Sequence, residues 1–252
     1  MRLTRVFVDC ALTPGSLVEL PPEPAAHLAR VLRARSGDEL TLFNGDGREF
    51  AGAVEAVRGS RVSASVGAAL CAERESPLAL TLLQCLPRGD RMDLIVQKST
   101  ELGVSRIQPV LSRRSVVRLD AKQAGSKTQH WRAIAISACE QCGRNRLPVI
   151  DPPLELIDHL SAAEGSRAAA PGLRLVLEPG MSEALPHDPG GGIELAIGPE
   201  GGFAAEELEA MRLAGFQRVA LGPRILRSET AAIAAIAWLQ TRYGDMREEP
   251  LS

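Results

Sequence analysis

The chain lacks any apolar run close to the roughly 20 residues that a membrane-spanning helix needs. Its first ten residues, MRLTRVFVDC, also lack the continuous apolar core of a secretory signal. A disulfide framework is not indicated either, because five scattered cysteines form an odd set that fits reduced thiols. These absences predict a cytoplasmic protein with no membrane partner.

Cys139 and Cys142 form a C-x-x-C motif, but no second Cys or His pair stands at the spacing of a zinc finger. The surrounding stretch HWRAIAISACEQCG has the pattern of an amphipathic helix. We therefore predict that both cysteines belong to a helix and that the chain has no metal site. A metal or redox role is the less favoured alternative.

Lysine is scarce, since Lys98, Lys122 and Lys127 are the only lysines among 29 cationic residues. The planar guanidinium of arginine suits phosphates and base edges, although a GC-rich genome produces the same bias. The charge is also uneven: residues 1–150 carry 21 Lys and Arg against 15 Asp and Glu, and the remainder carries 8 against 16. This asymmetry indicates that a polyanion contacts only part of the molecule.

Short β-like runs separated by turn signals, such as NGDG at 44–47, fill the first 70 or so residues. Regular spacing of this kind predicts a small barrel. One helix-like piece, PAAHLARVLRAR, interrupts the runs and would place Arg30 and Arg33 on one helical flank. That flank is either a binding surface or simply a solvated face.

The charged stretch CAERESPL, near residues 71 to 77, marks a domain boundary. Beyond it, strand-like and helix-like segments alternate, from LALTLLQCLP and DRMDLIVQKSTELGV to the final helix TAAIAAIAWLQTRYG. Such alternation predicts an α/β domain with a parallel sheet flanked by helices. The sequence thus divides into a first domain, 1–72, and a second domain, 73–252.

Three strands in the second half end in Gly or Pro, in the segments LVLEPG (175–180), AIGPEGG (196–202) and ALGPR (220–224). In open parallel sheets, ligands bind where the carboxyl ends of the strands and their loops converge. Glycines at such places either form tight turns or let the backbone approach a ligand closely. We favour a ligand pocket, with simple turns as the alternative.

Sequence signatures of phosphate binding are missing, because the chain has neither GxxxxGK[ST] nor GxGxxG after a strand. Glu200 lies among the glycines, and Glu206 and Glu207 fall in the first turn of the next helix, at its positive dipole end. A polyphosphate there would meet like charges. The pattern favours a non-phosphorylated, adenosine-like cofactor over ATP or NAD.

Two segments, IGPEGGF (197–203) and LGPRILRSETA (221–231), together resemble the paired C-terminal motifs of the SPOUT methyltransferases. The chain is similar in particular to the RsmE family, the uridine-N3 methyltransferases of 16S ribosomal RNA. Further matches are RVFV, MDLIVQKSTELGVSRIQPVLSRRS and WRAIAISACEQCGRNRLP, so the resemblance covers nearly the whole chain.

The resemblance implies an RNA-binding, PUA-like β-barrel over 1–72. It also implies a SPOUT-type α/β domain over 73–252, with a parallel sheet and a C-terminal trefoil knot. Hydrophobic periodicity does not reveal a knot, which is a rare exception to untangled topology. A homodimer is implied as well, in which the small-residue helix TAAIAAIAWL and the knot meet their counterparts in the partner.

In that family S-adenosylmethionine binds among the loops of the knot, and its positive sulfonium makes a nearby carboxylate such as Glu200 tolerable. Carried over to this chain, the cofactor-binding residues are Leu177, Glu178, Gly198, Pro199, Glu200, Gly201, Gly202, Leu221, Gly222, Ile225 and Leu226.

Methyl transfer to uracil N3 requires that the N3 proton be removed or that the resulting anion be stabilised. We predict that Arg227 and Glu229 lie nearest the substrate and that Arg224 also stabilises a developing uracil oxyanion. Glu200 or Glu229 is the candidate base. Phosphate anchoring by Arg227 and stabilisation of the helix N-terminus by Glu229 are open alternatives.

The RNA-binding candidates are all arginines, namely Arg2, Arg5, Arg30, Arg33, Arg113, Arg114, Arg144 and Arg146. Because 3% aromatic residues leave little surface for stacking RNA bases, recognition should depend on arginine, shape and ribosomal context. The expected partner is 16S rRNA within the assembled small ribosomal subunit, and not DNA.

Two other functions are compatible with the same segments. One is a non-catalytic RNA-binding or ribosome-assembly factor, which the intact IGPEGG and LGPRILRSET segments disfavour. The other is a SPOUT methyltransferase acting on a different tRNA or rRNA nucleotide, which the MDLIVQKSTELGV and CEQCGRNRLP segments disfavour.

Overall fold

The computed structural model describes residues 4–165, 172–180 and 182–247. They form two compact units. The first is built from the described part of Met1–Glu75 together with Ile136–Leu147, and the second from the described parts of Ser76–Ala135 and Pro148–Ser252. Within these described residues, every helix is too short or too polar to span a bilayer.

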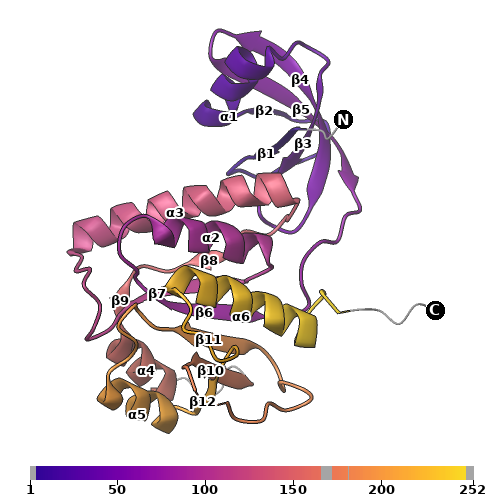
Figure 1. Ribbon diagram of the computed structural model, residues 1–252. Coiled ribbons are helices and arrows are strands. Elements are labelled where there is room, and N and C mark those ends of the chain that lie inside the picture. Colours follow the sequence, from indigo (N-terminus) through magenta and orange to yellow (C-terminus); the bar gives the residue numbers. More distant parts are fainter. Residues whose placement is uncertain (1–3, 166–171, 181, 248–252) are drawn as a thin grey trace. The chain divides into compact units, whose positions relative to one another are not determined.

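The first unit is a five-stranded sheet in the order β1-β3-β4-β5-β2 (Figure 1). Its strands are β1 (Thr4–Phe7), β2 (Leu17–Glu19), β3 (Glu39–Phe43), β4 (Glu49–Arg58) and β5 (Arg61–Leu70). β1 and β3 are parallel, and the other pairs are antiparallel. Two register shifts in β4 increase the local twist of the sheet, and its apolar residues form a separate small core that includes Leu42, Val54 and Val62. This mixed sheet is consistent with the predicted PUA-like barrel.

The helix-like piece of the first unit is shorter than its sequence suggests. It consists of α1 (Pro22–His27) and a π-helical turn, η1 (Leu28–Leu32). Arg33 then adopts a left-handed conformation with φ of 51° and ends the helix. The prediction that Arg30 and Arg33 share a helical flank is therefore wrong.

The second unit contains a parallel sheet in the order β12-β10-β11-β6-β7-β8, with β9 also paired to β7. The strands are β6 (Leu80–Cys85), β7 (Arg106–Leu111), β8 (Val149–Ile150), β9 (Leu154–Glu155), β10 (Leu173–Leu177), β11 (Ile193–Ile197) and β12 (Phe216–Val219). The α/β prediction is confirmed. The central strands are almost continuously apolar because helices cover both faces of the sheet.

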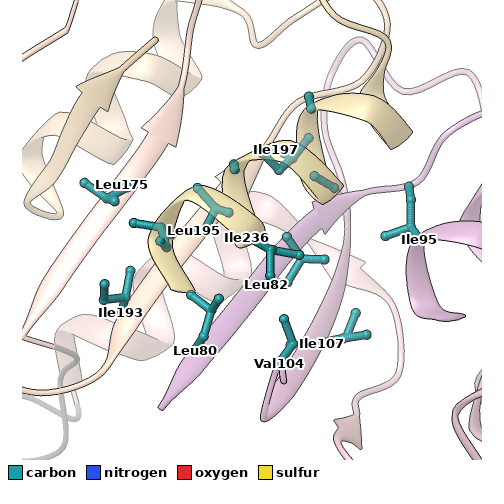
Figure 2. Packing of buried hydrophobic residues seen from close by; sticks show 14 of the residues in the cluster. Leu80, Leu82, Ile95, Val104, Ile107, Leu175, Ile193, Leu195, Ile197 and Ile236 are labelled. Carbon is teal, nitrogen blue, oxygen red and sulfur yellow. The ribbon is translucent and has the colours of Figure 1, made fainter. Parts of the chain in front are cut away.

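Helices pack on both faces of this sheet, as Figure 1 shows. They are α2 (Arg91–Glu101), α3 (Ala121–Cys142), α4 (Leu156–Gly165), α5 (Ala205–Leu213) and α6 (Ser228–Tyr243). On one face, Leu80 and Leu82 pack with Ile236 of α6 and with side chains of α2 and α3 (Figure 2). On the other face, Leu83 and Cys85 pack with α4 and α5. Burial of both faces fixes the strand ends that carry the glycine turns.

Two local features of the second unit follow from its sequence. Helix α2 ends at Glu101, and Gly103 follows its C-cap residue Leu102 with a φ of +84°. Lys98 pairs with Glu101 at 2.9 Å. Helix α4 and the two-residue strands β8 and β9 were not predicted, because short segments carry little periodicity.

The C-x-x-C motif lies at the end of α3, as predicted. Burial raises the pKa of the Cys139 thiol to about 12, so this thiol is an inert part of the core at neutral pH. Among the described residues, no group of three or more metal-ligating side chains comes together.

Candidate functional site

A cavity of about 260 Å³ lies at the carboxyl ends of β10, β11 and β12 in the second unit. It is lined by Arg114, Leu177, Glu178, Pro179, Ile197, Gly198, Pro199, Glu200, Gly202, Phe203, Leu208, Leu221, Gly222, Arg224, Ile225, Leu226, Ser228 and Ala231. The three strand-end loops with Gly and Pro converge here, at the edge where open parallel sheets bind ligands.

The predicted cofactor-binding residues gather around this one cavity. All of them line it except Gly201. The carbonyl oxygen of Gly201 accepts a hydrogen bond of 2.9 Å from Nη1 of Arg114, which is itself a lining residue. Their role in cofactor binding stays a prediction.

The glycines of these loops have two structural causes, and one of them is the tight turn that the sequence predicted as an alternative. Gly202 and Gly222 have φ of +66° and +72°, a backbone conformation that favours glycine. Gly198 has an ordinary φ, but a Cβ there would lie 3.2 Å from the ring of Phe203. Turn geometry thus accounts for Gly202 and Gly222, and close packing beside the cavity accounts for Gly198.

Ser228, a cavity residue that the sequence reasoning missed, links helix α6 to the loop after β11. Its Oγ donates to the carbonyl oxygen of Gly198 at 3.0 Å and accepts from Nε2 of Gln84 at 3.0 Å. Gln84 is fully buried in β6. A Ser at this position is a recognised signal for the start of a helix. Its hydrogen bond to Gln84 could not be predicted, because the two residues lie far apart in the sequence.

Glu200 faces Arg88, in the loop between β6 and α2, and Arg91, the first residue of α2. Its Oε1 lies 2.6 Å from Nη1 of Arg91 and accepts a longer bond, 3.3 Å, from the backbone N–H of Arg88. Partial burial alone would raise the pKa of Glu200, but the backbone amides of Glu200 and Arg88 and the charges of Arg91 and Arg88 lower it below its ordinary value of 4.5. Glu200 is therefore an ionised carboxylate at neutral pH.

The predicted catalytic residues lie in the loop after β12 and in the first turn of α6. Arg224 lines the cavity, and Arg227 is the N-cap of α6. Both are exposed, and the described residues offer neither guanidinium an ion pair within 4.0 Å. Glu229, in the first turn of α6, is half-buried, with Oε1 3.7 Å from Nε of Arg91. The catalytic roles of these three residues stay predictions.

Two predicted RNA-binding arginines, Arg113 and Arg114, follow β7 and lie beside the cavity. The backbone N–H of Arg113 donates to Oε1 of Glu207 at 2.8 Å, and its guanidinium lies 3.6 Å from Glu206. Glu207 also accepts a hydrogen bond from the backbone N–H of Ala204, and it thereby caps the N-terminus of α5. The loop after β7 is thereby tied to the loop after β11.

In the first unit, Arg5 and Arg144 are structural. Arg5 pairs with Glu49 and donates to Oδ1 of Asn145 at 2.7 Å. Arg144 pairs with Glu75 at 2.9 Å. Because both guanidiniums are almost fully buried in ion pairs, the RNA-contact proposal does not extend to them.

The other predicted RNA-binding arginines of the first unit differ in their surroundings. Arg30, Arg33 and Arg146 are on the surface. The guanidinium of Arg146 covers Gly47, where an added Cβ would lie 2.7 Å from it. Arg2 lies outside the described residues.

Comparison with known families gives the class of the protein. A family model described as an RNA methyltransferase domain matches residues 74–240. A second model, described as an RNA methyltransferase PUA domain, matches residues 20–66. The two matches define an RNA methyltransferase with an attached PUA domain.

Similar proteins and solved structures identify the family within this class of RNA methyltransferases. The chain is 31% identical to the ribosomal RNA small subunit methyltransferase E of Buchnera aphidicola from Schizaphis graminum, over 97% of this chain and 98% of that protein. A methyltransferase structure from Legionella pneumophila with the bound cofactor SAM has a TM-score of 0.90 and 41% identity, over 97% of this chain and all of that one. A ribosomal RNA small subunit methyltransferase E from Neisseria gonorrhoeae, bound to S-adenosylmethionine, has a TM-score of 0.87 and 38% identity, over 98% of this chain and 100% of that one. The chain therefore belongs to the ribosomal RNA small subunit methyltransferase E family, and the resemblance seen in its motifs is confirmed.

Proposed function

We propose that this chain transfers a methyl group from S-adenosylmethionine to N3 of a specific uridine in 16S ribosomal RNA, within the assembled small ribosomal subunit. One observation carries the proposal. In a chain of this family, the loops after β10, β11 and β12 converge on a single cavity, at the edge where open parallel sheets bind ligands.

The residues of the cavity fit S-adenosylmethionine. Leu177, Leu221 and Leu226 give the cavity apolar wall for an adenine ring. Glu178 and Glu200 place carboxylates at the cavity, where a positively charged sulfonium and amino group are favoured and a polyphosphate is not. The bound cofactor supplies an electrophilic methyl group on sulfur.

The chain's own residues then orient the acceptor and handle its proton. Arg224 and Arg227, exposed next to the cavity, are available to stabilise negative charge on a uracil oxygen. Glu229 is the better candidate base, because Glu200 is held ionised by Arg91 and by backbone amides, which makes it a weak proton acceptor. Alignment of the acceptor with the methyl group supplies the rest of the rate enhancement.

The remaining expectations complete this proposal. The PUA-like domain, 1–72, binds RNA through surface arginines such as Arg30 and Arg33, and the domain 73–252 carries out methyl transfer. The enzyme is a cytoplasmic homodimer. The C-terminal segment of the second domain forms the trefoil knot that the family resemblance implies.

The proposal is tested with methyl-labelled S-adenosylmethionine and small ribosomal subunits that lack the modification, followed by nuclease digestion and mass spectrometry of the 16S rRNA. We expect a single labelled nucleoside, N3-methyluridine. Label on a ribose, on another base or on tRNA would overturn the assignment of the acceptor. Failure to transfer label to any RNA would instead favour a non-catalytic binding factor.

A matched pair of glycine variants serves as the control for the site. Gly198→Val should abolish transfer and cofactor binding, because its side chain would collide with the Phe203 ring beside the cavity. Gly201→Ala should retain both, because a Cβ there makes only an ordinary contact with Arg114, at 3.7 Å.

A further inference from the structure

Arg91 lies where three elements of the second unit meet. It is the first residue of α2, directly after the loop that follows β6. Its Nη1 lies 2.6 Å from Oε1 of Glu200, in the loop after β11. Its Nε lies 3.7 Å from Oε1 of Glu229, in the first turn of α6. One guanidinium thus contacts a lining residue of the cavity and a predicted catalytic residue.

The chemistry of these contacts depends on the shape of the guanidinium. Two carboxylates beside the same cavity repel each other unless a cation lies between them. Arginine presents different N–H groups to two acceptors in a fixed geometry, whereas the ammonium of lysine is a single point charge. Oε2 of Glu229 is buried and has no hydrogen-bond partner among the described residues, so Glu229 keeps one oxygen available for another donor.

We propose that Arg91 is a positioning residue for the proposed methyl transfer, which fixes Glu200 of the cofactor loop and Glu229 of α6 in one arrangement. The inference rests on the proposed function of the cavity. Since Arg91 is absent from the cavity lining, it acts through the two carboxylates and not by touching the cofactor.

The first test measures coupling by calorimetry with S-adenosylhomocysteine as the probe. Arg91→Met should weaken binding by about tenfold, and the same change in a Glu200→Gln background should add little, because the two residues act as one unit. Arg91→Lys should restore part of the affinity. Additive losses, or unchanged affinity in Arg91→Met, would overturn the proposal.

A pH series adds a second readout, taken only at pH values where circular dichroism shows both wild type and variant to be folded. Glu200 has a lowered pKa, so its ionised form persists as the pH falls towards its ordinary value of 4.5. In Arg91→Met the carboxyl should gain its proton at a higher pH, and affinity for S-adenosylhomocysteine should fall off earlier on acidification. An identical pH profile in wild type and variant would contradict the inference.

Hydrogen exchange of the free protein separates this inference from the proposed function. Arg91→Met should speed amide exchange in both segments, 198–203 and 227–231, while Arg212→Met, on an exposed pair with Glu209, should change neither. Wild-type protein that shows this exchange coupling but does not bind S-adenosylhomocysteine would overturn the proposed function. Methyl transfer by wild type, combined with unchanged exchange in Arg91→Met, would overturn the inference alone.

Discussion

Arg5 and Arg144 of the first unit and Arg224 and Arg227 of the second unit show two different roles for arginine in this protein. In the first unit, the side chains of Arg5 and Arg144 are each 7% exposed and are paired with Glu49 and Glu75. In the second unit, Arg224 and Arg227 are exposed at or next to the cavity, with no ion pair within the described part of the chain. Removing one partner of a buried ion pair strongly destabilises the fold, because the other charge is left buried and unpaired. An exposed guanidinium, in contrast, binds an anion at little cost to the fold. The carboxylates around an arginine, and not its place in the sequence, decide which role it has.

The largest effect is expected from breaking a buried pair. Arg144→Met leaves the carboxylate of Glu75 without its cation, so the free energy of unfolding should fall by about 3 kcal/mol. The loss is at the lower end of the range because Glu75 keeps hydrogen bonds from the backbone N–H groups of Asn145 and Arg146. Urea denaturation followed by circular dichroism measures it. A loss no larger than that of the exposed control Arg212→Met would show that Arg144 is not structural.

The second effect should appear in catalysis and not in stability. Arg227→Met removes a donor proposed to stabilise charge on the acceptor, so methyl transfer to small subunits should fall by about 10²- to 10³-fold. Stability and affinity for S-adenosylhomocysteine should stay close to wild type, because the guanidinium is exposed. Single-turnover kinetics measures the rate of methyl transfer, and calorimetry measures the affinity for S-adenosylhomocysteine. Full activity in this variant would remove Arg227 from the site.

A smaller effect is expected from the surface of the first unit. Reversing two charges in the double variant Arg30→Glu with Arg33→Glu should weaken binding to small ribosomal subunits by about tenfold at physiological salt, with a smaller difference at high salt. Filter binding across a salt series measures this. Urea denaturation and S-adenosylhomocysteine affinity provide the controls, and a loss of stability in step with binding would mean that these arginines support the fold.

The smallest effect concerns Glu140, whose Oε1 accepts the backbone N–H of Phe7. Burial raises the pKa of Glu140 above its ordinary value of 4.5, although the Phe7 bond and the charges of Arg5 and His27 oppose the shift. Its favourable contribution is therefore present below pH 4.5 and is lost as the pH rises through the raised pKa. Glu140→Gln, which keeps an acceptor for Phe7, should be more stable than wild type at pH 7 and should lose this advantage on acidification. If the difference in stability between Glu140→Gln and wild type were the same at pH 7 and below pH 4.5, the raised pKa of Glu140 would be contradicted.

The sequence predicted the cavity well because its information is local. Each glycine turn directly follows an apolar strand, and parallel strands bring their carboxyl ends to one edge of the sheet. The same rule applies to the loop after β6, which leads directly into Arg91 at the start of α2. That loop has no Gly-Pro signal to distinguish it from an ordinary connection.

Other features depend on partners far away in the chain. The bond between Gln84 and Ser228 spans 144 residues, and the pair of Arg91 with Glu200 spans 109. Likewise, Arg5 is buried only because Glu49 and Asn145 meet it in the folded unit. A single sequence without its fold gives no signal for these pairs, so structural and exposed arginines looked alike.

The central claim is that the loops after β10, β11 and β12 form the binding site for S-adenosylmethionine. A crystal structure of the protein with S-adenosylhomocysteine tests it most directly. We expect density for the ligand in the cavity, against Leu177, Gly198 and Leu221. Ligand density elsewhere on the molecule, with this cavity filled by the protein's own side chains, would contradict it.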